Sequence, residues 1–193
     1  MAPRPKVTRE MIVDAGLSVA REQGIENVNA RTVSERLGCS TQPVMYHFSR
    51  IEELKRAIYA KADEYHSTFL MDAREENRLL GIGLNYIRFA QTEKHLFRLL
   101  FQSNELAGKS VADLTDAEEL LPIFEVLSQT AGINMAQARD VFRSLFLFVH
   151  GYASMFANNS LTYDERVIAK DIERAFTGAL HTVKEETTCR NCI

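Results

Sequence analysis

The side chains that most resemble catalytic machinery lie in "SNELAGKS", residues 103–110. A phosphate-binding loop has the pattern G-x-x-x-x-G-K-[ST]. Gly108, Lys109 and Ser110 match its end, but Ser103 stands where the first glycine is required. Such a loop also follows a buried strand, whereas the preceding "LFRLLF" has helical surroundings. The five histidines show no metal-ligand spacing, and no G-x-S-x-G motif occurs. The sequence therefore predicts no enzyme, no metal and no cofactor, with a helical nucleotide-binding enzyme as the alternative.

Two cysteines near the end of the chain form a C-x-x-C pair, Cys189 and Cys192. One such pair is half of a zinc site, and no further cysteine or histidine nearby completes it. A redox-active pair is expected at the start of a helix beside a strand. We interpret residues 187–193 as a polar tail, in which a role for the two cysteines is left open.

A different chemistry is predicted for "RLGCSTQPVMYHFSR", residues 36–50. Gly38 permits a tight turn between two helices, Ser40 is expected to cap the second one, and Pro43 fits its first turn. Apolar residues hold the two helices together: Val33, Leu37, Cys39 and Val44. Thr41, Gln42 and Tyr46 have no reason to be buried, and they suit the edges of bases in a major groove. The pattern favours a helix-turn-helix with a recognition helix at about 40–47; a plain helical hairpin or a protein-interaction module are the alternatives.

The charge of the chain is mildly uneven. The 193 residues have a formal net charge of −3. Residues 1–60 contain nine Lys and Arg against seven Asp and Glu, and the rest of the chain contains fourteen against nineteen. This is consistent with a small DNA-facing end on an acidic body. No apolar run is long enough to span a membrane, and the first ten residues lack the apolar core of a signal peptide, so we expect a cytoplasmic protein.

The rest of the pattern is helical throughout, which predicts an all-α protein. A first helix is expected from a cap at Thr8 to Gly24, a second from Asn29 to Leu37, and a fourth from Ile51. Further helices are expected around 84–89 and over 93–101, 116–129, 135–157 and 163–184, with residues 102–115 as a loop. We divide the chain into an N-terminal three-helix domain, 6–66, a larger helical domain, 67–186, and the tail.

Two segments of the first domain resemble the TetR family of transcriptional regulators: "TREMIVDAGLSVAREQG", residues 8–24, and "RTVSERLGCSTQPVMYHFSRIEELKRAI", residues 31–58. The resemblance implies a DNA-contacting set of Arg31, Ser40, Thr41, Gln42, Pro43, Tyr46, His47 and Arg50, with His47 reaching a phosphate. This chain has Met45 where the family usually has a phosphate-touching Tyr, and Ile51 where it usually has a Lys. Tyr46 and Arg50 are the expected replacements. Arg4, Lys6 and Arg9 are expected either to form a minor-groove arm or to be a solvated tail.

The second domain is expected to bind a ligand and to dimerise. Large rings with a few polar tips suggest a pocket for a hydrophobic effector, although most must be core: Tyr86, Phe89, Phe97, Phe101, Phe124, Phe146, His150 and Tyr152. The resemblance implies a homodimer through the last two long helices. The candidate interface residues are Gly151, Ile168, Ile172, Ala175, Phe176, Ala179, Leu180 and Val183. We expect a ligand-responsive DNA-binding repressor that binds a palindromic operator on double-stranded DNA as a dimer and is released by a small hydrophobic effector.

Overall fold

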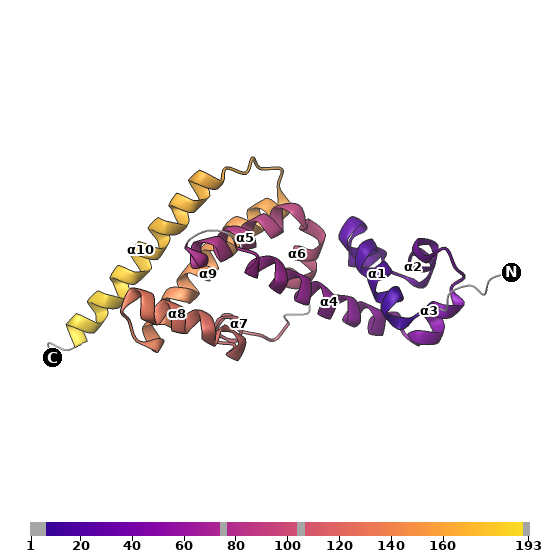
Figure 1. Cartoon of the computed structure of the whole chain (residues 1–193), viewed down its shortest axis with the longest axis horizontal. Coiled ribbons are helices and arrows are strands. Elements are labelled where there is room, and N and C mark those ends of the chain that lie inside the picture. The colour runs from indigo at the N-terminus through magenta and orange to yellow at the C-terminus, as the bar shows by residue number, and fades with distance from the viewer. Residues whose placement is uncertain (1–6, 74–76, 104–106, 191–193) are drawn as a thin grey trace. The chain divides into compact units, whose positions relative to one another are not determined.

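The computed structural model describes residues 7–73, 77–103 and 107–190, with side chains described up to residue 186, and this part of the chain is helical without any strand (Figure 1). Two compact units result. The first combines residues 1–69 with residues 92–105, and the second combines residues 70–91 with residues 106–193. The all-α prediction is confirmed. No helix among the described residues is both long and apolar enough to cross a membrane.

The first unit is built around α1, Arg9–Gln23. Thr8 caps this helix, as predicted, by accepting a hydrogen bond on Oγ1 from the Met11 amide at 3.2 Å, and Gly24 ends it at φ 92°. The other elements of this unit are η1 (Ile25–Asn27), α2 (Ala30–Leu37), α3 (Gln42–His47), α4 (Ile51–Met71) and α6 (Lys94–Phe101). A Cβ on Gly16 would lie 2.5 Å from the Cδ1 of Ile58, so α1 and α4 pack closely at this point.

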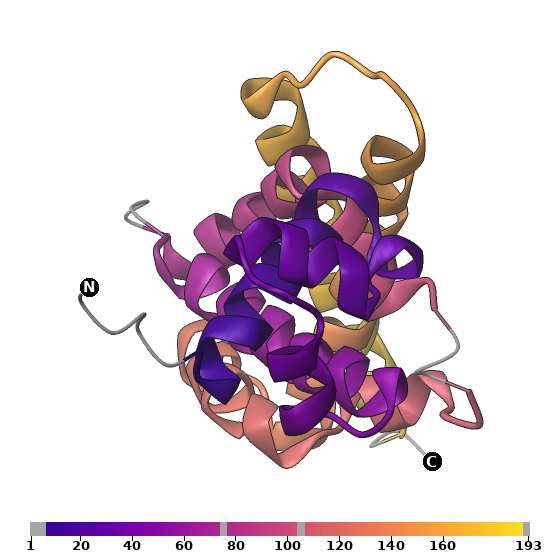
Figure 2. The same cartoon turned by 90° about the vertical axis from the view of Figure 1, so that its right-hand side faces the viewer.

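The second unit contains α5 (Arg78–Thr92), α7 (Val111–Thr115), η3 (Glu118–Leu120), α8 (Leu121–Ala131), α9 (Met135–Asn158) and α10 (Glu165–Arg190). Helices α9 and α10 form a long hairpin whose connection loops outward (Figure 2). Their packing is fixed near one end by the Tyr152 hydroxyl, which donates to the Asp171 carboxylate at 2.6 Å, and near the other by the Gln137 amide, which donates to the Val183 carbonyl at 3.0 Å.

Three local predictions were wrong. Residues 102–115 are not all loop, because Ser110 and Asp113 form a capping box that starts α7. The helix expected over 116–129 is instead the short η3 followed by α8, which extends to Ala131 and ends at Gly132 with φ 62°. Ser40 does not cap α3, since Thr41 is the residue at that position and makes no capping hydrogen bond with its side chain.

Candidate functional site

The turn between α2 and α3 is fixed by backbone geometry at Gly38. This residue has φ 63° and ψ 34°, in the left-handed region that favours glycine. Its amide donates to the Glu35 carbonyl at 3.2 Å, and the next amide, of Cys39, donates to the Ser34 carbonyl at 3.0 Å. These bonds satisfy the last carbonyls of α2 and reverse the chain within a few residues. At the other end, Asn29 caps α2 by accepting from the amides of Arg31 and Thr32.

The short helix α3 is held by its apolar side. Val44 and Phe48 are 1% and 3% exposed, and Val33 on α2 is fully buried. Leu37 and Cys39, also expected to hold the two helices together, are only half-buried. These contacts leave the opposite side of α3 outside the core.

That outer side carries the side chains that the sequence assigned to the major groove. Thr41 and Gln42 are exposed, Met45 is 54% exposed and Tyr46 is 82% exposed. Residues 42, 45 and 46 are one helical turn apart and share a face. Because most of this large phenol ring is exposed, the outer side of α3 offers polar and apolar groups that a major groove could accept.

The other predicted contact residues come from α2, from α3 itself and from the segments on either side of α3. Arg31, Ser40 and Arg50 are exposed, whereas Pro43 is half-buried. The Nε of Arg31 donates to Glu35, one turn along α2, at 2.9 Å.

His47 has a partner within its own chain. Its Nε2 lies 3.1 Å from the Val7 carbonyl oxygen and donates a hydrogen bond to it. Its ring meets Tyr46 edge-on at 5.2 Å. His47 therefore holds the start of the described chain beside α3. Arg9, considered above as part of a flexible arm, belongs to α1 and lies over the ring of Phe48 at 4.7 Å. Arg4 and Lys6 lie outside the described residues.

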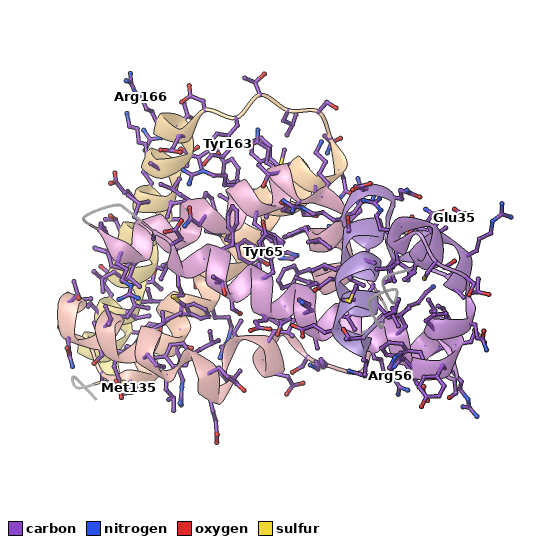
Figure 3. All side chains as sticks on the ribbon, turned by 45° about the vertical axis from the view of Figure 1, so that its right-hand side comes forward. Glu35, Arg56, Tyr65, Met135, Tyr163 and Arg166 are labelled. Atoms are coloured by element: carbon purple, nitrogen blue, oxygen red, sulfur yellow. The ribbon has the colours of Figure 1, made fainter. Side chains whose placement is uncertain are left out.

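An ion-pair cluster that sequence reasoning missed joins α1 to the rest of the first unit. The guanidinium of Arg21 makes two hydrogen bonds to the carboxylate of Glu93, one of them at 2.6 Å from Nε. Tyr65 of α4, which is labelled in Figure 3, donates from its hydroxyl to the same carboxylate at 3.2 Å. Glu93 is only 5% exposed, and its bond raises the pKa of Arg21. Since Tyr65 is on α4 and Glu93 precedes α6, this cluster fixes the position of α1 on both helices.

In the second unit, a row of rings follows one face of α9. Phe142, Phe146 and His150 are four residues apart, and successive rings stack with centroids 6.2 Å and 5.6 Å apart. Tyr86 of α5 joins this row, because its hydroxyl shares a hydrogen bond of 2.9 Å with the Nδ1 of His150. Phe124 of α8 meets the other end at Phe142. Burial raises the pKa of Tyr86 and lowers the pKa of His150, so both groups are neutral near pH 7.

The remaining pocket candidates are Phe89, Phe97, Phe101 and Tyr152. Phe89 is fully buried in the second unit, while Phe97 and Phe101 pack on each other in the first unit with centroids 5.1 Å apart. Tyr152 is engaged with Asp171 and Phe148 and does not join Tyr86 and His150. Of the eight predicted residues, Tyr86, Phe146 and His150 are in direct contact with one another. Phe124 is connected to them by Phe142, which packs on both Phe124 and Phe146.

The predicted dimer residues of α10 pack largely within the single chain. Ile168, Ile172 and Val183 are buried, and Phe176, Ala179 and Leu180 pack on a cluster that includes Phe124, Leu127 and Val141. Ala175 is half-buried. The outer side of the hairpin is different. A Cβ on Gly151 or Gly178 would meet no atom within 4 Å, and Leu147 and Met155 of α9 are about half exposed.

The candidate chemistry for an enzyme finds little support in the geometry. Ser110 of the "AGKS" stretch is used as the cap of α7, and no strand precedes it within the described chain. No group of three or more His, Cys, Asp or Glu side chains is arranged around a common point among the residues described. Cys189 and Cys192 lie outside the described side chains.

Comparison with known proteins adds evidence from a part of the chain that the motif does not cover. A family model described as "Tetracyclin repressor-like, C-terminal domain" matches residues 79–183, more than half of the chain. The chain is also similar to a protein of Bacillus subtilis strain 168 named "Uncharacterized HTH-type transcriptional regulator YobS". The two are 18% identical over 177 residues, which cover 87% of this chain and 88% of the relative. The resemblance seen in residues 8–58 and the family match over residues 79–183 are thus independent of each other.

Proposed function

Because the chain belongs to the TetR family of transcriptional regulators, we propose that this DNA-binding regulator is a repressor that binds a palindromic operator as a homodimer and is released by a small, mainly apolar effector. The observation that carries the DNA-binding part is the exposed face of α3, with Tyr46 82% exposed beside Gln42. A helix held by Val44 and Phe48 on one side leaves this face available to a major groove.

The homodimer is supported by the outer side of the α9–α10 hairpin. Leu147 and Met155 are 48% and 55% exposed, and between them Gly151 has open space where a Cβ would be. Apolar side chains around a glycine suit the close approach of a second helix. A dimer presents two α3 helices, and two half-sites about one turn of DNA apart give a palindromic operator. The α10 stripe also packs on its own chain through Phe176 and Leu180, and Gly151 is a further candidate contact.

The dimer is tested by Leu147→Arg, with Val126→Arg on α8 as the matched control because the two side chains are 48% and 45% exposed. We expect light scattering to give twice the chain mass for the unchanged protein and the control, and the single-chain mass for Leu147→Arg. A wild-type chain that remains monomeric at micromolar concentration would contradict the proposal that a dimer binds a palindromic operator with two α3 helices.

The effector is supported by the neutral hydrogen-bonded pair of Tyr86 and His150 within the aromatic row. An apolar wall with one or two polar groups is typical of small-molecule sites, and neutral groups favour an uncharged guest. We expect apolar compounds to raise the melting temperature in a thermal-shift screen. At a hundred times its dissociation constant a ligand adds roughly 2.7 kcal/mol to the free energy of unfolding. Hits should release the operator from the wild-type protein and act more weakly on Tyr86→Phe. If only phosphorylated compounds raise the melting temperature, the proposal of an apolar effector is contradicted.

The DNA-binding part is tested by selection of duplexes from a random library. We expect the wild-type chain to enrich a palindromic sequence and Tyr46→Ala to lose selective binding with unchanged helix content. Tyr46→Phe is the control, because it keeps the ring in the groove. Unchanged affinity and selectivity of Tyr46→Ala would show that α3 does not read the DNA.

A further inference from the structure

The helix α3 lacks the side chains that most often read guanine. Its six residues, "QPVMYH", include neither arginine nor lysine. The commonest base-specific contact in major grooves is a bidentate hydrogen bond from Arg or Lys to the O6 and N7 of guanine. A recognition helix without these side chains has no such donor for guanine from its own residues.

The cations nearest to α3 along α2 are held by acidic partners. The Nε of Arg31 donates to Glu35 at 2.9 Å, and the Nη1 of Arg36 donates to Glu22 of α1 at 2.7 Å. Within α3 itself, the Nε2 of His47 donates to the Val7 carbonyl. These contacts leave an amide, a thioether and a phenol as the groups that project from α3.

Those groups match one class of base pair. The side-chain amide of Gln42 has a donor and an acceptor, which pair with the N7 and N6 of adenine. Met45 offers a flexible apolar side chain, 54% exposed, and the matching feature in a major groove is the 5-methyl group of thymine. Gln42 and Met45 are three residues apart on one helix face, so they reach the same or neighbouring base pairs.

We infer that α3 reads A·T base pairs, with Gln42 hydrogen-bonding an adenine and Met45 packing on a thymine methyl group in each half-site. Met45, which replaces the residue expected to touch a phosphate, becomes a specificity-determining residue. The inference rests on the proposed function, since it names the bases that the same helix would contact.

The experiment uses base analogues in the duplex that the wild-type chain selects. Deoxyuridine in place of each thymidine removes only the methyl group, and 7-deazaadenine in place of each adenine removes only N7. The loss of one buried methyl corresponds to about a fourfold loss of affinity at one position. The loss of part of a bidentate contact corresponds to about a tenfold loss at an adjacent position. Fluorescence anisotropy at fixed salt measures both.

Variants assign each loss to a side chain. Met45→Ala should bind the unmodified duplex about fourfold more weakly and lose nothing further on the deoxyuridine duplex, whereas Met45→Leu should keep its sensitivity to the methyl group. Gln42→Ala should bind the duplexes with adenine and with 7-deazaadenine equally well, and it should keep its sensitivity to the thymine methyl group. A selected half-site with G·C pairs at the contacted positions overturns the inference, and so does a Met45→Ala protein that remains as sensitive to deoxyuridine as the wild type. A chain that selects no duplex removes the proposed function itself, which is a separate outcome.

Discussion

The stability of the first unit should depend on pH through a buried histidine of α4. His66 is 7% exposed and packs edge-on against Phe101 at 5.1 Å. Burial lowers the pKa of His66 to about 4, from an ordinary value of 6.5. Between these two values the unfolded chain binds a proton that the folded chain does not. The free energy of unfolding therefore falls as the pH decreases through this window, and it is unaffected by His66 above about pH 6.5.

The magnitude follows from the two pKa values. Lowering the pH from 8 to 5 should remove about 2 kcal/mol through His66 alone, because each pH unit inside the window is worth up to about 1.4 kcal/mol. For a chain of this length that corresponds to a fall in melting temperature of about 4–8 °C. Burial also lowers the pKa of His150, so the total loss should be larger than this share.

Urea unfolding at pH 8 and pH 5 isolates the contribution of His66. The quantity to compare is the change between the two pH values, since His66→Leu also alters the stability at pH 8. We expect His66→Leu to lose about 2 kcal/mol less than the wild type on acidification. Equal losses in the wild type and His66→Leu would refute the idea that a neutral buried imidazole sets this dependence.

Three further predictions concern the first unit. Arg21→Gln leaves the buried carboxylate of Glu93 without its bidentate partner and should lower the free energy of unfolding by about 2 kcal/mol. This is less than for a fully buried pair, because Arg21 is half exposed. Urea unfolding measures the loss, and the double variant Arg21→Gln/Glu93→Gln should recover part of it. Gly38→Ala and Gly132→Ala both place a Cβ at φ near +62° in open space, so each should lower the free energy of unfolding by roughly 1 kcal/mol. Only Gly38→Ala should weaken DNA binding. Equal DNA affinities of the two variants would show that the turn does not set the position of α3. Met45→Tyr should reduce the preference for thymidine over deoxyuridine duplexes, because the thioether no longer packs on the methyl group. The salt dependence should not become steeper, because a phenol displaces no counterion.

Local signals explain why some of the fold could be predicted from the sequence. The capping residues Thr8 and Asn29 and the turn at Gly38 act within three or four residues, and the helices they bound match the expectation. The capping box of Ser110 and Asp113 is a signal of the same kind, and its S-x-x-D pattern was overlooked.

Long-range contacts explain what the sequence could not show. Arg21 and Glu93 are 72 residues apart, and nothing in their local pattern pairs them. In the same way, the apolar stripe of α10 reads equally well as a dimer surface or as the inner side of a hairpin. The packing of Phe176 and Leu180 on the core of their own chain is a contact that no local pattern indicates. The pairing of Tyr86 with His150 likewise depends on how α5 and α9 lie together.

Site-specific photo-crosslinking tests most directly whether α3 enters the major groove. A photoreactive amino acid would replace Tyr46, with a second protein labelled at Val126, which is 45% exposed on α8, as the control. Each would be irradiated on the duplex that the wild-type chain selects. If α3 enters the major groove, position 46 gives covalent adducts to bases of both half-sites and position 126 gives none. Adducts from position 126 with none from position 46 would contradict it.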